Sequence, residues 1–181
     1  MKPWNASKIH YIKLGRNHAW WEECLNNNTI RLGFNTGDPE VLEMANSGDW
    51  NSLKKVYWPS RTKTPTQHTN QMRKFFEDTG KTLWITFEDG CLFYGFSNGG
   101  QVFPFKGVGQ EKFGSSSYRK MAREGWSNLD AKGKTLRLEE LSGRLTKTAA
   151  FRQTICDFGK EVENYLRNRI GGKVSPEVEQ T

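Results

Sequence analysis

The chain has 181 residues, which is enough for one domain, and its mean hydropathy of -0.78 is that of a protein with a large polar surface. It contains no run near the roughly 20 apolar residues that a membrane span requires, and Met1 to Asn5 lack the apolar stretch of a signal peptide. We therefore expect a cytoplasmic protein with no membrane partner. The net charge of +7 favours an anionic partner such as nucleic acid.

The three cysteines are odd in number and far apart, at Cys24, Cys91 and Cys156. No C-x-x-C pair is present, so the sequence supports neither a disulfide framework nor a zinc knuckle. The three histidines are equally scattered. We expect no metal and no cofactor.

The first half of the chain is predicted to contain a strand, a helix and a second strand, followed by three helices. Asn17 and Asp38-Pro39 are helix-start signals, Thr64-Pro65 repeats the second of these, and Gly80 is a helix stop. In chain order we expect a strand over 9–15, a helix over 18–25, a strand over 29–34, and helices over 40–45, 50–56 and 67–77.

The second half reads mainly as a strand meander. Asp89-Gly90 between two apolar runs predicts a type I′ hairpin, and helical spacing predicts a last helix ending near Ile170. Strands are expected over 82–88, 91–97, 102–105 and 118–123, while 136–141 and 151–158 fit either type of element. The order predicts an α+β fold with a curved or barrel-like mixed sheet and helices on its rim. Residues 1–172 should form one domain, followed by a polar tail over 173–181.

Basic residues gather in two stretches. Residues 54–74 hold six basic and no acidic side chains, and residues 112–147 hold nine basic against four acidic. Such clustering is typical of a footprint on a phosphate backbone, although basic side chains on a solvated face would give the same pattern. The expected backbone contacts are Arg31, Lys54, Lys55, Arg61, Lys63, Arg73, Lys74, Arg119, Lys120 and Arg123.

Seven tryptophans accompany this charge, and two of them, Trp20 and Trp21, are adjacent. Trp84 reads as strand core, and core packing is the simplest role for most of the others. Two clusters suggest more: Trp126-Ser127-Asn128 and Gly33-Phe34-Asn35 each place a ring beside short hydrogen-bonding groups. A base that is turned out of the helix is held by such rings and read along its edge.

Catalytic motifs are missing from the sequence. It contains no H-E-x-x-H, no nucleophile elbow and no phosphate-binding loop. Glu161 and Glu163 lack the accompanying lysine of a restriction-type nuclease core. We therefore expect no catalytic residue.

The order of elements resembles a known superfamily. A strand ending in Lys13-Leu14-Gly15, a helix, and then residues 30–35 (IRLGFN) resemble the opening of PUA-like domains, in particular of the EVE and YTH branches. The helix at 72–76 running into the strand at 83–87 looks like their helix-to-barrel step. Residues 123–156 are similar to N-terminal modules fused to nucleases in bacterial modification-dependent restriction systems. The resemblance covers roughly residues 8 to 170.

This resemblance implies a non-enzymatic domain that flips a modified DNA base into an aromatic pocket, and that works with a nuclease domain or subunit. The insert from Asp38 to Trp58 would supply one ring of the pocket. The expected base-binding residues are Lys13, Trp20, Trp21, Gly33, Phe34, Asn35, Trp58, Trp126, Ser127 and Asn128. An RNA-binding PUA-like protein, a nuclease or base-modifying enzyme, and a protein-interaction or inhibitor protein remain alternatives.

Overall fold

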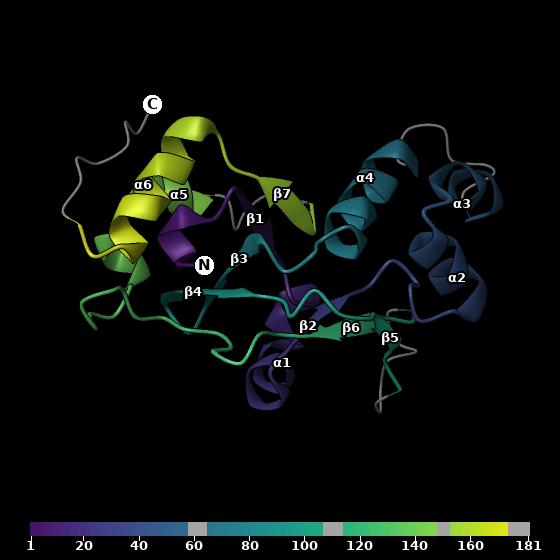
Figure 1. Cartoon of the computed structure of the whole chain (residues 1–181), viewed down its shortest axis with the longest axis horizontal. Helices are drawn as coiled ribbons and strands as arrows, with labels where there is room; N and C mark the ends of the chain where they lie inside the picture. Colours follow the sequence, from purple (N-terminus) through teal and green to yellow (C-terminus); the bar gives the residue numbers. More distant parts are fainter. Residues whose placement is uncertain (58–64, 107–113, 148–152, 174–181) are drawn as a thin grey trace.

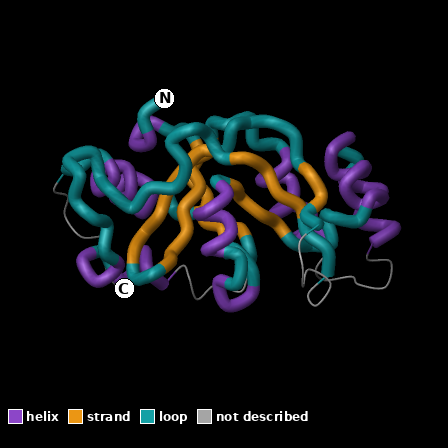
Figure 2. Tube along the Cα trace, turned by 90° about the horizontal axis from the view of Figure 1, so that it is seen from below, coloured by secondary structure: helices purple, strands orange, loops and turns teal. Residues whose placement is uncertain are grey.

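A computed structural model describes residues 1–57, 65–106, 114–147 and 153–173 of the chain. Strands occupy the middle of the molecule, and helices flank them at both ends (Figure 2). In the described part of the chain, no helix is both long and apolar enough to cross a membrane.

The central sheet has four strands in the order β4-β3-β1-β7. The strands are β1 (Lys8–Ile12), β3 (Thr82–Glu88), β4 (Cys91–Phe96) and β7 (Ile155–Asp157). β1 and β3 run parallel, with Lys8 opposite Thr82, and the other two pairings are antiparallel. The hairpin between β3 and β4 turns at Asp89 and Gly90, which both have positive φ, as the predicted type I′ turn requires.

A second sheet has three antiparallel strands in the order β2-β6-β5. The strands are β2 (Thr29–Leu32), β5 (Phe103–Pro104) and β6 (Ser117–Lys120). A bridge between Ser97 and Met121 joins the end of β4 to the end of β6. The α+β class is confirmed. The barrel-like part of the expectation is wrong, because among the described residues the strands form two sheets that meet at this bridge without closing.

Six α-helices cover these sheets in the described ranges. Figure 1 shows α5 and α6 together beside the central sheet, α2 to α4 grouped at the opposite end, and α1 against the three-stranded sheet. The helices are α1 (Trp21–Asn27), α2 (Pro39–Ser47), α3 (Trp50–Tyr57), α4 (Pro65–Phe76), α5 (Gly143–Thr146) and α6 (Lys160–Ile170).

The two faces of the central sheet are each buried in a hydrophobic core. Ile9 and Tyr11 of β1 pack with Leu166 and its neighbours on α6. Ile12, one position further along the strand, joins the other core with Leu32 of the three-stranded sheet. Because successive side chains of β1 point to opposite faces, this strand contributes to both cores and joins α6, the central sheet and the three-stranded sheet.

Two helix-start predictions need correction. Asn17 does not cap α1: it lies in a 3₁₀ turn with φ of 56°, and α1 begins four residues later, at Trp21. α2 does begin at Pro39, but the Asp38 carboxylate makes no capping bond and instead accepts a hydrogen bond of 2.6 Å from Ser115 Oγ.

The structure also assigns an element within each of the two segments, 136–141 and 151–158, whose type the sequence left open. Residues 138–140 form a 3₁₀ turn, and 155–157 form β7. The predicted tail lies outside the described residues from position 174 onward.

Candidate functional site

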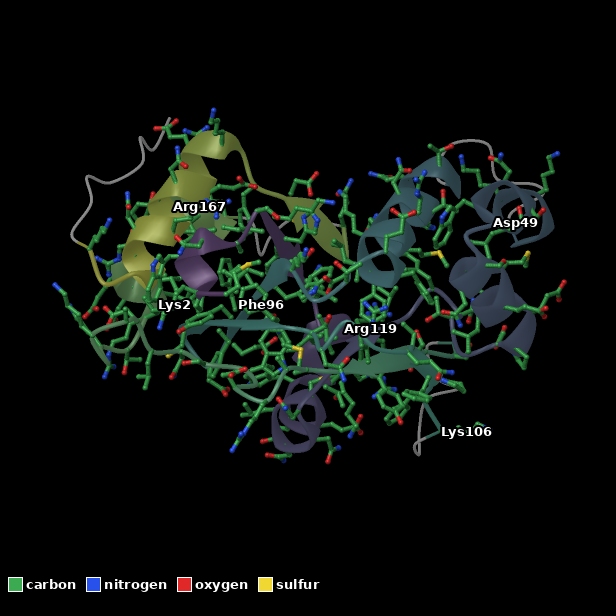
Figure 3. All side chains as sticks on the ribbon, viewed as in Figure 1. Lys2, Asp49, Phe96, Lys106, Arg119 and Arg167 are labelled. Atoms are coloured by element: carbon green, nitrogen blue, oxygen red, sulfur yellow. The ribbon has the colours of Figure 1, made fainter. Side chains whose placement is uncertain are left out.

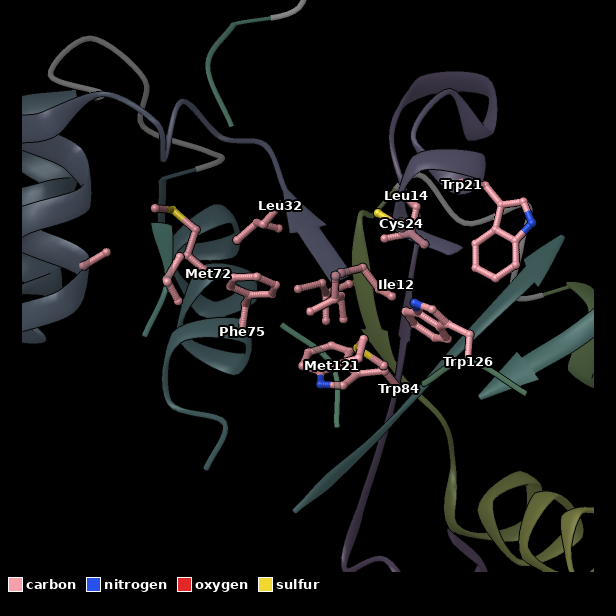
Figure 4. Packing of buried hydrophobic residues seen from close by; sticks show 14 of the residues in the cluster. Ile12, Leu14, Trp21, Cys24, Leu32, Met72, Phe75, Trp84, Met121 and Trp126 are labelled. Atoms are coloured by element: carbon pink, nitrogen blue, oxygen red, sulfur yellow. The ribbon is translucent and has the colours of Figure 1, made fainter. Parts of the chain in front are cut away.

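Trp21 and Trp126 are core residues. They are 3% and 8% exposed, and their rings meet edge to face with centroids 5.7 Å apart (Figure 4). Each indole N–H has an internal partner, the Asp89 carboxylate for Trp21 and the Thr29 carbonyl for Trp126. The expectation that these rings stack on a base is corrected here, because burial leaves neither ring a face for a ligand.

Ser127 and Asn128 continue from Trp126 as strand-like backbone. Ser127 exchanges two backbone hydrogen bonds of 2.9 Å with Tyr94, and the Asn128 carbonyl accepts one of 2.7 Å from the Leu136 amide. Both residues are half-buried. Ser127 lines a hollow of about 550 Å³ that also involves Gly125 and the N-terminal residues. The hollow that Ser127 lines does not include Phe34 or Asn35, with which the sequence had grouped it.

The Phe34 cluster forms a tight turn after β2. Phe34 and Asn35 have φ of 57° and 55°, a left-handed conformation that is rare for a bulky residue such as phenylalanine. The buried Thr36 hydroxyl holds the turn through the Leu32 and Gly33 carbonyls and the Ser117 hydroxyl. The Asn35 side chain accepts a hydrogen bond from the Ser115 amide, so its oxygen already has a partner.

Trp20 lies between the ends of β1 and β2. Its ring covers Gly15 so closely that a Cβ there would lie 2.8 Å from the indole, and a Cβ on Gly33 would lie 3.4 Å from it. Lys13 is half-buried at the end of β1, and the Phe34 ring lies 5.0 Å from the His68 ring. The structure thus brings Trp20, Gly33 and Phe34 together. Trp58 lies outside the described residues.

Arg31 is buried between two aromatic rings. Its guanidinium carbon is 4.2 Å from the Trp20 ring centroid and 3.5 Å from that of Phe105. Nε donates to Ser116 Oγ at 2.9 Å, and Nη1 donates to Glu23 Oε1 at 3.2 Å. Burial lowers the pKa of Arg31 from its usual value. Because only 4% of Arg31 is exposed, its expected role as a phosphate contact is wrong.

Arg119 is also an internal residue. Its guanidinium donates to the carbonyls of Phe75, Phe76 and Asp78, so it satisfies the C-terminal end of α4. Burial lowers its pKa as well, and it is 5% exposed. Its assignment to the phosphate backbone is corrected in the same way.

The remaining predicted phosphate contacts are at the surface. Lys55, Lys120 and Arg123 are exposed, and Lys54 is half-buried. Arg73 pairs with Glu77 at 3.2 Å, and Lys74 pairs with Asp157 at 3.1 Å. The other two predicted contacts, at positions 61 and 63, lie outside the described residues.

A pocket of about 410 Å³ lies on the outer face of the three-stranded sheet, under α1. Two rings, Phe105 and Tyr118, line it together with the polar side chains of α1 and two lysines. Its volume falls within the range of about 300–1,000 Å³ that is typical of small-ligand sites. The polar and basic lining residues are Glu23, Asn27, Thr29, Lys106 and Lys120.

Strand alternation explains why these residues share one face. Tyr118 and Lys120 are two apart on β6 and point outward, while Arg119 between them points to α4. The Tyr118 ring centroid lies 5.7 Å from that of Phe103 and 6.3 Å from that of Phe105. Figure 3 places Lys106 at the free end of β5 and Arg119 beside α4.

The pocket joins rings to positive charge. The Trp20–Arg31–Phe105 stack lies next to the pocket on the side of the protein interior. Phe103, which is 38% exposed, extends the aromatic surface outside the pocket. Sequence reasoning missed Phe105 and Tyr118, although Phe103 and Phe105 two apart, and Tyr118 and Lys120 two apart, were readable as one strand face. Such a surface can stack a planar ring and hold a phosphate.

No group of three or more His, Cys, Asp or Glu side chains within the described ranges could hold a metal ion. Comparison with protein-family models, curated proteins and solved structures gives no significant match for the chain.

Proposed function

We propose that this protein is a non-enzymatic nucleic-acid-binding domain that holds one unstacked base in the pocket between α1, β5 and β6. The observation that carries the proposal is the pocket itself, in which Phe105 and Tyr118 stand beside Lys106 and Lys120. Rings supply the stacking surface and lysines supply the phosphate contacts that an extruded base needs.

The energetics are adequate for a base drawn out of a duplex. Extrusion costs a few kcal/mol, and stacking on an aromatic side chain returns about 1–3 kcal/mol per base. The net charge of +7 adds a favourable contribution from the phosphates. Glu23 and Asn27 add acceptor and donor groups that can discriminate between base edges.

The resemblance to PUA-like modules of modification-dependent restriction systems supports two finer parts of the proposal. The occupant would be a modified base in DNA, and the domain would be the specificity module of such a system, working with a nuclease. The PUA-like resemblance rests on the sequence motifs around Lys13 and Gly33, and the likeness to restriction-system modules rests on residues 123–156.

The test is an affinity comparison at one salt concentration. Duplexes with a single 5-methylcytosine, 5-hydroxymethylcytosine or N6-methyladenine are titrated by fluorescence anisotropy against the unmodified duplex. We expect one modified duplex to bind at least about tenfold more tightly, a difference of about 1.4 kcal/mol. Equal affinities across the panel would exclude modified-base reading.

Substitution of Tyr118 tests the pocket. Tyr118→Ala should weaken binding of the preferred duplex by about 5- to 150-fold, since it removes about 1–3 kcal/mol of stacking. Tyr118→Phe is the matched control, because it keeps the ring and should bind within about twofold of the unchanged protein, well inside the roughly 1.4 kcal/mol of a tenfold change.

One observation favours RNA as a second candidate. The exposed Phe103 next to Tyr118 extends the rings across an open sheet face, which is how several single-stranded RNA binders stack successive bases. Competition between RNA and DNA oligomers of matched sequence separates the two. Tighter binding of the RNA single strand would transfer the proposal to RNA.

A further inference from the structure

A second pocket lies where β1 and β3, the parallel strands of the central sheet, begin beside the C-terminal half of α4. Its volume is about 420 Å³. The three-stranded sheet lies between this pocket and the base pocket. α4 and β7 stand side by side here (Figure 1), and the Lys74–Asp157 ion pair joins them. Arg119, which faces α4, and Lys120, which lines the base pocket, point to opposite faces of β6, so the sheet separates the two pockets.

The rim of this second pocket carries excess positive charge. Lys8, Arg73, Lys74 and Lys81 line it, against only two carboxylates, Glu77 and Asp78. Lys8 and Lys81 are exposed, and the described residues include no ion-pair partner for either one. Two positive charges are therefore left without a counter-charge at the mouth.

The two carboxylates are already engaged. Asp78 is buried, accepts hydrogen bonds from the Trp84 indole at 3.0 Å and from Ser97 Oγ at 2.6 Å, and lies 3.9 Å from Arg119. Glu77 holds Arg73 in an exposed i,i+4 pair, an interaction of small energy that an incoming anion can replace. Lys8 and Lys81 are thus available to a ligand, Arg73 becomes available when it releases Glu77, and Lys74 stays paired with Asp157.

The remaining lining is polar and supplies uncharged donors. Ser7, Asn70 and Thr79 contribute two hydroxyls and an amide. His10 stands in the wall with Nδ1 at 2.8 Å from the Asp157 carboxylate. A ring of cations with hydroxyl and amide donors is the donor set that phosphate oxygens require, because charge-assisted hydrogen bonds to them are short and strong.

We infer that this pocket is a phosphate-binding site, with Lys8 and Lys81 as its main charged ligands and Arg73 as a third once it releases Glu77. The ligand is a phosphate-bearing group, either a phosphodiester of bound nucleic acid or a free phosphorylated molecule. The inference does not depend on the base pocket, since none of its ligands lines that pocket.

Inorganic pyrophosphate is the probe, titrated into the ¹⁵N-labelled protein at about 0.15 M salt, where the screening length is about 8 Å, and followed by NMR. We expect saturable shifts at Ser7, Lys8, Thr79 and Lys81. The double variant Lys8→Glu/Lys81→Glu should weaken binding by at least about tenfold, as expected when two charge-assisted contacts are lost. Lys132→Glu/Lys160→Glu makes the same charge change at two exposed lysines outside the pocket, and it should leave affinity within about twofold, since distant surface charges are largely screened by salt.

The source of the phosphate is read from a competition on the same sample. If an oligonucleotide displaces pyrophosphate from these residues, the ligand is the nucleic-acid backbone. If pyrophosphate still binds to the oligonucleotide-saturated protein, the ligand is a free phosphorylated molecule. Absence of saturable shifts at the pocket, or equal losses in the two double variants, would overturn the inference, whatever the Tyr118 variants show at the other pocket.

Discussion

The guanidinium of Arg31 lies over the ring of Phe105, with its central carbon 3.5 Å from the ring centroid. Trp20 covers the other side at 4.2 Å, so a cation from β2 is held between one ring near α1 and one ring after β5. This stack joins the three-stranded sheet to α1 and forms the inner neighbour of the base pocket. We therefore expect the Trp20–Arg31–Phe105 stack to hold the wall of the base pocket in place.

Arg31→Ala should lower the free energy of unfolding by about 2–4 kcal/mol, because it leaves a cavity between two rings and removes the bonds to Ser116 and Glu23. Urea denaturation followed by tryptophan fluorescence measures the change. Arg123→Ala, at an exposed position, is the control and should stay within about 0.5 kcal/mol. Equal values for the two variants would contradict the stacking role.

Trp126→Phe should affect stability and leave nucleic-acid affinity unchanged. The substitution orphans the Thr29 carbonyl, at a cost of about 1–3 kcal/mol, in a core where Trp126 also packs on Trp21. Thermal unfolding and anisotropy titration at a temperature where the variant is folded measure the two effects. A large loss of affinity without loss of stability would restore Trp126 to the binding site.

Lys120→Ala should reduce the salt dependence of nucleic-acid binding. If Lys120 contacts one phosphate, the slope of log K against log salt should fall in magnitude by about 1. Lys132→Ala is the control, since Lys132 is exposed and lies outside the pocket. An unchanged slope for Lys120→Ala would place the backbone elsewhere.

His10 should make stability depend on pH. Desolvation, the largest effect, lowers the pKa of His10 below its ordinary value of 6.5, although Asp157 acts in the opposite direction. The unfolded chain then binds the proton more readily, so the contribution is complete above pH 6.5 and is lost as the pH falls through and below that value.

The measurement is the free energy of unfolding between pH 7.5 and 5.5 for the unchanged protein and for His10→Gln. The unchanged protein should lose more stability than the variant over this interval. Parallel curves would show that His10 does not titrate differently on folding.

The fold was largely predictable because its local signals are strong. Asp38-Pro39, Thr64-Pro65 and Asp89-Gly90 mark α2, α4 and the hairpin where the structure has them. The failures are of another kind. Asn17 has the chemistry of a cap but lies in a turn fixed by Trp20 against Gly15. The way in which the two sheets meet depends on long-range pairing, such as Ser97 with Met121, which no local pattern specifies.

The site was harder to predict because it also depends on pairing between residues far apart in the sequence. Arg31, Arg119 and Trp126 have the composition of a nucleic-acid surface, and only the fold shows that each is bonded internally. Conversely, Phe105 and Tyr118 are ordinary strand residues in the sequence. They become a pocket because β5 pairs with β6, with Phe103 opposite Tyr118.

The most direct test of the central claim is an NMR titration of ¹⁵N-labelled protein with the preferred modified duplex and with its unmodified counterpart. We predict that the modified duplex alone causes large shifts at Asn27, Phe105, Lys106, Tyr118 and Lys120, and that in Tyr118→Ala the shifts of the other four residues saturate at about 5- to 150-fold higher duplex concentration. Saturable binding with the largest shifts around Trp126 to Asn128, and none at Tyr118, would contradict it.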